Sequence, residues 1–193
     1  MQEIPALLLI DVQKGFDEHA RWGGNRNNPQ AEANVERLLM QWRAQGWPVV
    51  HVRHDSVVPG SNLAAGQAGN EFKDEVKPLA AEPIFSKSVN SAFIGTGLQA
   101  YLEAQGIHAL VIVGLTTDHC VSTTTRMAGN LGFETYLVAD ATATFDKMGF
   151  DGQLYPAELV HQTALASLHS EFATVLTTDQ VVEMVSAEAP LRT

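Results

Sequence analysis

The chain has 193 residues, a length that predicts a single domain spanning residues 1–193. Its formal charge of −10, from 22 acidic and 12 basic side chains, argues against a nucleic-acid groove or an anionic membrane surface as a partner. The apolar runs are far shorter than the roughly 20 residues that cross a bilayer, and the amino terminus lacks the basic segment of a secretory signal. One cysteine excludes an internal disulfide framework and suits a reducing compartment, so we expect a cytoplasmic globular protein.

Six short apolar runs alternate along the chain with longer segments of helical character. This alternation predicts an α/β fold built from βα units around a mostly parallel sheet. Most of the runs are continuous rather than alternating, which is typical of strands covered on both faces. The predicted strands are residues 6–10, 48–53, 83–85, 109–113, 135–138 and 173–176.

Helices are expected between these strands. Residues 31–45 place four apolar side chains at spacings of three and four, and Gly46 follows as a stop signal. Thr96 is a candidate cap for the next helix. The remaining predicted helices are residues 97–105, 120–129, 156–168 and 177–185.

Two long segments have only weak periodicity and are expected to be loops. They are residues 54–82 and 139–155, and each follows a predicted strand. Loops of this length in a compact domain are usually functional or disordered. Both are expected to emerge at the carboxyl ends of the strands.

Ligands of an open parallel sheet bind in the crevice outside the carboxyl ends of its strands. The polar residues that come shortly after the predicted strands are therefore expected to share one rim. They are Asp11, His54, Lys87, Cys120 and Asp140.

Cys120 is the only cysteine of the chain. Alone, a cysteine is more often a small buried hydrophobic residue than a nucleophile. Here it falls where a turn becomes a helix, and the unpaired N–H groups of a first helical turn favour the thiolate. The residues that follow, 121–125, are mediocre helix formers. Cys120 is thus a candidate nucleophile with a lowered pKa.

Asp11 and Lys87 also occupy unusual positions. No G-x-G-x-x-G sequence follows the first strand, so Asp11 does not belong to a dinucleotide-binding fingerprint. Lys87 leaves a core strand, and a buried ammonium group needs a carboxylate or thiolate partner. Asp11 and Cys120 are the candidates for that partner.

Three blocks of this sequence resemble the isochorismatase-like cysteine hydrolases, a family that includes nicotinamidases and N-carbamoylsarcosine amidase. The blocks are Asp11-Val12-Gln13, Lys87 with the capped helix after it, and residues 114–121, GLTTDHCV. The resemblance extends over residues 7–176. With the alternation of elements, it implies a Rossmann-like, three-layer α/β/α sandwich with a central six-stranded, mostly parallel sheet.

The resemblance implies a catalytic triad of Asp11, Lys87 and Cys120. It also implies a non-proline cis peptide between Leu115 and Thr116, and an oxyanion hole formed by the backbone N–H groups of Thr116 and Cys120. The expected activity is hydrolysis of a C–N bond of a small amide, lactam or ureide through a thioester, with no cofactor. A homodimer or homotetramer is expected.

Two departures narrow the substrate class. Isochorismatases carry a carboxylate where this chain has Cys120. Nicotinamidases carry an Asp-x-His metal motif after the second strand, and residues 53–56, RHDS, lack it. On a strand, His51 and His54 point to opposite faces, so we expect no metal. A nicotinamidase or pyrazinamidase remains an alternative, as do a non-catalytic binding domain of the same fold and a redox-sensing thiol.

The expected substrate contacts are less specific. His54 either contacts substrate or satisfies a local loop hydrogen bond. For His119 a packing role is favoured over a His–Cys dyad. A small-molecule pocket is mostly apolar, so we expect it to involve the aromatic residues of the surrounding segments, namely Phe16, Trp22, Phe93, Phe145 and Tyr155.

Overall fold

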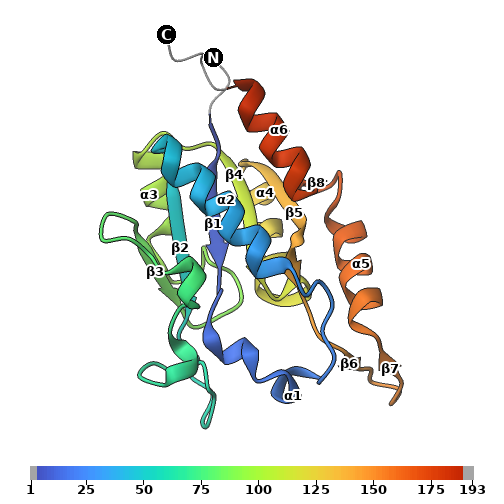
Figure 1. Ribbon diagram of the computed structural model, residues 1–193. Coiled ribbons are helices and arrows are strands. Elements are labelled where there is room, and N and C mark those ends of the chain that lie inside the picture. Colours follow the sequence, from blue (N-terminus) through green and yellow to red (C-terminus); the bar gives the residue numbers. More distant parts are fainter. Residues whose placement is uncertain (1–3, 189–193) are drawn as a thin grey trace.

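The computed structural model describes residues 4–188 (Figure 1). Its centre is a six-stranded sheet in the order β3-β2-β1-β4-β5-β8, and all five strand pairs are parallel. All six predicted strands are confirmed. Their bounds are β1 (Ala6–Ile10), β2 (Val49–His54), β3 (Ile84–Lys87), β4 (Ala109–Leu115), β5 (Glu134–Ala143) and β8 (Thr174–Leu176).

Helices cover both faces of the sheet (Figure 1). On one face lie α2 (Ala31–Gln45) and α6 (Thr178–Glu188), and on the other α3 (Leu98–Ala104), α4 (Ser122–Asn130) and α5 (Ala157–Leu168). This is the predicted three-layer α/β/α sandwich, and each predicted helix is found within a few residues of its expected bounds. Within the described range, no helix has the length and hydrophobicity of a membrane-spanning segment.

Helix α2 illustrates why the sequence forms these elements. Its four predicted apolar side chains are buried against the sheet. Trp42, the largest of them, is fully buried, and its indole Nε1 donates a hydrogen bond to the carbonyl of Pro5 at 2.9 Å. The helix ends at Gly46, which adopts the left-handed conformation with φ 69° and returns its N–H to the last turn, as predicted.

Strand β1 lies at the centre of the sheet and is buried on both faces. Ile10 pairs with Val52 of β2 and with Gly114 of β4. The strand order reverses between β1 and β4, and such a switch point is where open α/β sheets bind ligands. Gly114 has φ 121°, and a Cβ there would lie 2.0 Å from the Ile10 carbonyl oxygen, so only glycine lets β4 approach so closely.

The prediction of a loop at residues 139–155 is wrong. Strand β5 continues through Ala143, and its last residues pair with the end of β4 beyond a bulge. An antiparallel hairpin follows, formed by β6 (Lys147–Met148) and β7 (Leu154–Tyr155). Small Ala and Thr residues give a weak strand signal in the sequence, yet Ala141 to Ala143 are fully buried and the strand is set by tertiary packing.

The segment at 54–82 is a loop, as predicted, with two short 3-10 turns, η2 (Ala68–Asn70) and η3 (Asp74–Val76). Between β1 and α2 lie two elements that were not predicted, η1 (Lys14–Asp17) and α1 (His19–Trp22).

A partly buried ion cluster joins the 54–82 loop and the segment between β1 and α2 to helix α2. Lys73 Nζ lies 2.5 Å from Asp17 and 2.7 Å from Glu32, and Arg26 forms two hydrogen bonds with the Glu32 carboxylate. Burial opposes ionisation of Glu32, but its bonds to Arg26 and Lys73 outweigh burial and lower its pKa to about 2. The cluster fixes both segments beside the sheet edge.

Candidate active site

A buried ion pair lies at the carboxyl edge of the sheet. Lys87, the last residue of β3, places its Nζ 2.6 Å from Oδ2 of Asp11, which follows β1 with φ 51°. Neither side chain is exposed to solvent. Asp11 is therefore the predicted partner of Lys87. Its other carboxylate oxygen, Oδ1, accepts no hydrogen bond within residues 4–188.

Cys120 lies beside this pair. It belongs to a π-helical turn, η4 (Thr117–Val121), that connects β4 to α4. A carboxylate oxygen of Asp11, a ring nitrogen of His54 and the Cys120 sulfur all lie within 4.8 Å of one another. The predicted cis peptide between Leu115 and Thr116 is present just before this turn. The fold thus brings Asp11, Lys87 and Cys120 together from the ends of three strands.

The thiol pKa differs from expectation. Burial and the negative charge of Asp11 together raise the pKa of Cys120 to about 12, and the ammonium of Lys87 offsets only part of this rise. The prediction of a lowered thiol pKa is therefore wrong for the resting protein. It rested on the N–H groups at the helix start, whereas burial and the adjacent Asp11 carboxylate have the larger effect on the thiol pKa. Burial also raises the pKa of Asp11, against the opposing charge of Lys87.

Cys120 is reached through two adjoining spaces. The inner cavity has a volume of about 110 Å³ and is lined by Asp11, Phe16, Trp22, His54, Leu63, Asn90, Thr116, His119 and Cys120. The outer groove, of about 360 Å³, is formed largely by residues 56–63 and also by Arg21. Trp22, His54 and Leu63 line both. Three of the six predicted substrate contacts, Phe16, Trp22 and His54, therefore border the inner cavity.

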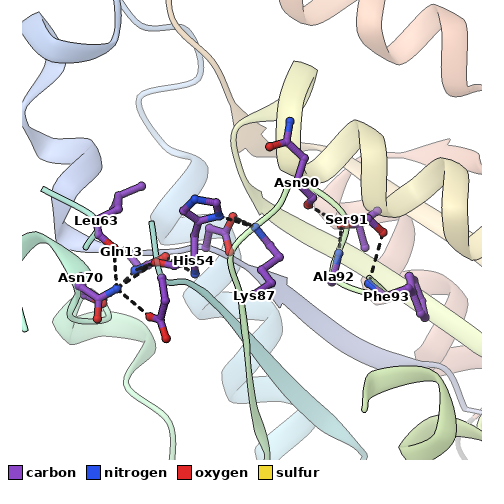
Figure 2. Close-up of polar contacts among 12 residues, drawn as sticks. Gln13, His54, Leu63, Asn70, Lys87, Asn90, Ser91, Ala92 and Phe93 are labelled. Atoms are coloured by element: carbon purple, nitrogen blue, oxygen red, sulfur yellow. Dashed lines mark hydrogen bonds and ion pairs between the residues drawn. The ribbon is translucent and has the colours of Figure 1, made fainter. Parts of the chain in front are cut away.

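The structure places the other three predicted contacts outside the lining of the inner cavity. Phe145 is fully buried behind Phe16 and Trp22, with ring centroids 6.5 and 6.4 Å away. Phe93 stacks on Phe133 at 5.7 Å, and its ring points away from Lys87 (Figure 2). Tyr155 belongs to the β6–β7 hairpin. These three residues follow strand ends in the sequence and were expected to line the pocket, but their side chains pack against other parts of the protein.

Three histidines near the site lie in different surroundings. The Nδ1 atom of His54 lies 3.1 Å from Lys87 Nζ, and the two side chains point toward one another in Figure 2. His51 points to the opposite side, as predicted, and its Nε2 lies 2.9 Å from Glu82. His119 corrects the expectation of a packing role, because its side chain is 55% exposed and borders the inner cavity.

Gln13 and Asn70 stabilise the site through hydrogen bonds, and the sequence analysis assigned a role to neither of them. The Gln13 amide donates to the carbonyls of His54 and Asn70, and its oxygen accepts the His54 N–H at 2.8 Å (Figure 2). Asn70 donates to the carbonyls of His54 and Leu63, both at 2.9 Å. These bonds fix the end of β2 and the start of the 54–82 loop. The only sequence signal was that Gln13 follows Asp11 by two positions.

Asp11, His54 and Cys120 offer donor atoms close enough for a metal ion. The Lys87 ammonium, however, contacts both Asp11 and His54, so the positive charge that these groups would seek is already supplied. Asp55, the nearest further carboxylate of the 53–56 stretch, is held by Arg53 and Asn70 at 3.0 Å each. The donor set therefore does not fit a bound cation.

A family model and several known proteins match this chain over most of its length. The family model named isochorismatase domain matches residues 5–180. YrdC, an isochorismatase family protein of Bacillus subtilis, is 50% identical over 182 residues, which cover 94% of this chain and 96% of that protein. A crystal structure of an isochorismatase-family protein from Chromobacterium violaceum matches with a TM-score of 0.93 at 44% identity, covering 97% of this chain and 96% of that one. Nicotinamidase 3 of Arabidopsis thaliana is 29% identical over 192 residues, covering 93% and 87%.

Proposed function

Since the chain belongs to the isochorismatase family of hydrolases, we propose that it cleaves a C–N bond of a small amide, lactam or ureide with Cys120 as nucleophile. The observation that carries the proposal is the buried Lys87–Asp11 pair, at 2.6 Å, bordering the only thiol of the chain. A nucleophile next to a base that is itself held by a third group is the arrangement of covalent catalysis.

Asp11 is the proposed general base. Burial and the charge of Asp11 raise the pKa of the Cys120 thiol to about 12, which favours the protonated thiol over a standing thiolate. Instead, Asp11 accepts the thiol proton as the sulfur attacks the carbonyl carbon. Its Oδ1, which accepts no hydrogen bond from the described residues, is the oxygen available for that proton.

Lys87 is proposed to keep Asp11 ionised. Burial alone favours the neutral carboxylic acid, and the ammonium at 2.6 Å opposes this. Lys87 thus maintains the carboxylate in a space where water cannot solvate it. Once Asp11 is protonated, Lys87 also stabilises the negative charge that moves toward the substrate.

The backbone N–H groups of Thr116 and Cys120 are the proposed oxyanion donors, because both residues border the inner cavity beside the sulfur. Such donors are worth roughly 10² to 10³ in rate each. As the C–N bond breaks, Asp11 returns its proton to the leaving nitrogen, and a thioester remains on Cys120. Water then attacks the thioester and gives a proton to Asp11, which passes it to the departing sulfur, so that the carboxylic acid, the free thiol and the Asp11 carboxylate result.

The dimensions of the site support a small substrate. A cavity of about 110 Å³ accommodates a carboxamide with a few further atoms, and larger substituents extend into the outer groove. The names of several relatives agree with this chemistry, among them Nicotinamidase 3, maleamate amidohydrolase and ureidoacrylate amidohydrolase. Because the donor set does not fit a cation, we propose a reaction that uses no metal.

The test is a hydrolysis screen that follows ammonia release from small amides and ureides, and the ring-opened amino acid by mass spectrometry for lactams, which release no ammonia. Wild type is compared with Cys120→Ala and Cys120→Ser, and with Gln162→Ala on the exposed side of α5 as a control. We expect release by wild type and the control, and loss of roughly 10³-fold or more in both Cys120 variants. Unchanged release in Cys120→Ala would overturn the proposal.

A further inference from the structure

His54 stands at the junction between the inner cavity and the outer groove. It is the last residue of β2, pairs in register with Lys87 of β3, and lines both spaces. Its backbone is fixed because Gln13 bonds its N–H and its carbonyl, and Asn70 bonds the same carbonyl. The imidazole is therefore anchored at the point where a bound molecule passes from one space to the other.

The contact with Lys87 determines which ring nitrogen carries the proton. A lysine ammonium offers only N–H donors, so the His54 Nδ1 at 3.1 Å must accept, and the ring proton resides on Nε2. Burial lowers the pKa of His54, and the positive charge of Lys87 lowers it further. The ring is thus neutral at neutral pH and presents one N–H donor.

The Nε2–H donor has no hydrogen-bond partner among residues 4–188. The described residues give His54 Nε2 no hydrogen-bond acceptor, and Phe16, Trp22 and Leu63 form an apolar part of the cavity lining that His54 shares. Phe16 and Leu63 have no polar side-chain atoms, and the Trp22 indole N–H already donates to the carbonyl of Gly15 at 2.8 Å. A half-buried donor in such surroundings is stabilised by an acceptor that arrives with a ligand.

We propose that His54 determines specificity by donating its Nε2 hydrogen bond to an acceptor on the substrate, either a carbonyl or carboxylate oxygen or a ring nitrogen. The inference rests on the proposed function, because a carbonyl held at Cys120 brings the acceptor to His54. A His54 ring nitrogen lies within 4.8 Å of the Cys120 sulfur. With the reacting carbon roughly 3 Å from the sulfur, the acceptor lies about two or three bonds from that carbon.

The first test observes the ring directly. Protein with ¹⁵N-labelled histidine is studied by NMR at pH 7, and the His54 signals are assigned by their loss in His54→Asn. We expect an unprotonated Nδ1 and a protonated Nε2, with this preference lost in Lys87→Met. A proton on Nδ1, or a charged ring, would overturn the proposal. This readout requires no catalysis.

The second test measures ligand preference by calorimetry in Cys120→Ala, with nicotinamide and benzamide as probes. These two amides differ by a single acceptor atom, the ring nitrogen. We expect roughly tenfold tighter binding of nicotinamide, the size of effect that one hydrogen bond supplies. Equal affinity, or no measurable binding of either amide, would contradict the role of His54.

Two variants of His54 separate its contacts. Asparagine keeps a polar atom at the position that faces Lys87 but lacks the distal donor, whereas glutamine places an N–H near the position of Nε2. We therefore expect His54→Asn to abolish the preference and His54→Gln to retain most of it. A preference that persists in His54→Asn would refute the proposal. If ammonia release survived in Cys120→Ala, the proposed function would fail while these binding results stood.

Discussion

Replacing Asp11 by asparagine separates two accounts of how Cys120 is activated. The substitution keeps the side-chain shape and removes the negative charge that lies beside both the thiol and Lys87. In the native protein, burial and Asp11 raise the thiol pKa from 9.0 to about 12. A difference of three units corresponds to about 4 kcal/mol. At pH 8, this rise in pKa reduces the fraction of Cys120 present as thiolate from about one molecule in ten to about one in ten thousand.

Without the carboxylate, the charge of Lys87 acts on the thiol unopposed. We expect the pKa of Cys120 in Asp11→Asn to fall by at least one unit, so the variant contains more thiolate than wild type. Its kcat/KM for amide hydrolysis should nevertheless fall by about 10²- to 10⁴-fold, because the general base is lost. More thiolate and less activity is the combination that identifies Asp11 as the proton acceptor.

The assay is a pH titration of thiolate ultraviolet absorbance, with Asp11→Asn/Cys120→Ala as the background control, alongside ammonia release at matched pH. If a standing thiolate were the nucleophile, Asp11→Asn would hydrolyse amides as fast as wild type or faster. That result, or a thiol pKa that rises in the variant, would refute the reasoning.

Three further substitutions test the structural account. Lys87→Met should lower the free energy of unfolding in urea by about 3 to 5 kcal/mol, because it leaves Asp11 buried and unpaired. Adding Asp11→Asn should restore most of this stability but no activity. Equal stability of the single and double variants would contradict this account. The pKa of Glu32 is lowered from 4.5 to about 2. The stability that this carboxylate gives the fold is therefore complete above pH 4.5 and is lost as the pH falls through 2. Glu32→Gln should lower the free energy of unfolding at pH 7 by up to about 3 kcal/mol and should make it depend less on pH in acid. Gly114→Ala should lower the Tm sharply or prevent folding, because the new Cβ meets the Ile10 carbonyl at 2.0 Å, and a Tm within a degree of wild type would disprove that.

The fold and the proximity of Asp11, Lys87 and Cys120 were predictable because they follow from strong, local signals. Continuous apolar runs predicted buried parallel strands, and because the carboxyl ends of such strands share one edge, Asp11, Lys87 and Cys120 were expected to lie close together. Periodicity and a stop glycine defined α2 almost to the residue. The assembly into a homodimer or homotetramer stays a prediction, since a single chain holds no contact between copies.

What escaped prediction depends on packing between distant segments. The extension of β5 through Ala143 rests on burial of small side chains that have little strand signal of their own. The orientations of Phe93 and Phe145 are set by neighbours far away in the sequence, whereas Tyr155 contacts residues of its own hairpin. The thiol pKa required knowing that Asp11 lies beside Cys120 and that both groups are buried, which no spacing in the sequence reveals.

The central claim is that Cys120 forms a thioester with the acyl part of its substrate. The direct measurement is intact-protein mass spectrometry of the enzyme, quenched by acid during turnover of an amide found in the ammonia-release screen, followed by peptide mapping. The account predicts a mass increase equal to the substrate minus ammonia, on the peptide that contains Cys120, and none in Cys120→Ala. Steady ammonia release with no adduct at Cys120, and with the same rate in Cys120→Ala, would contradict it.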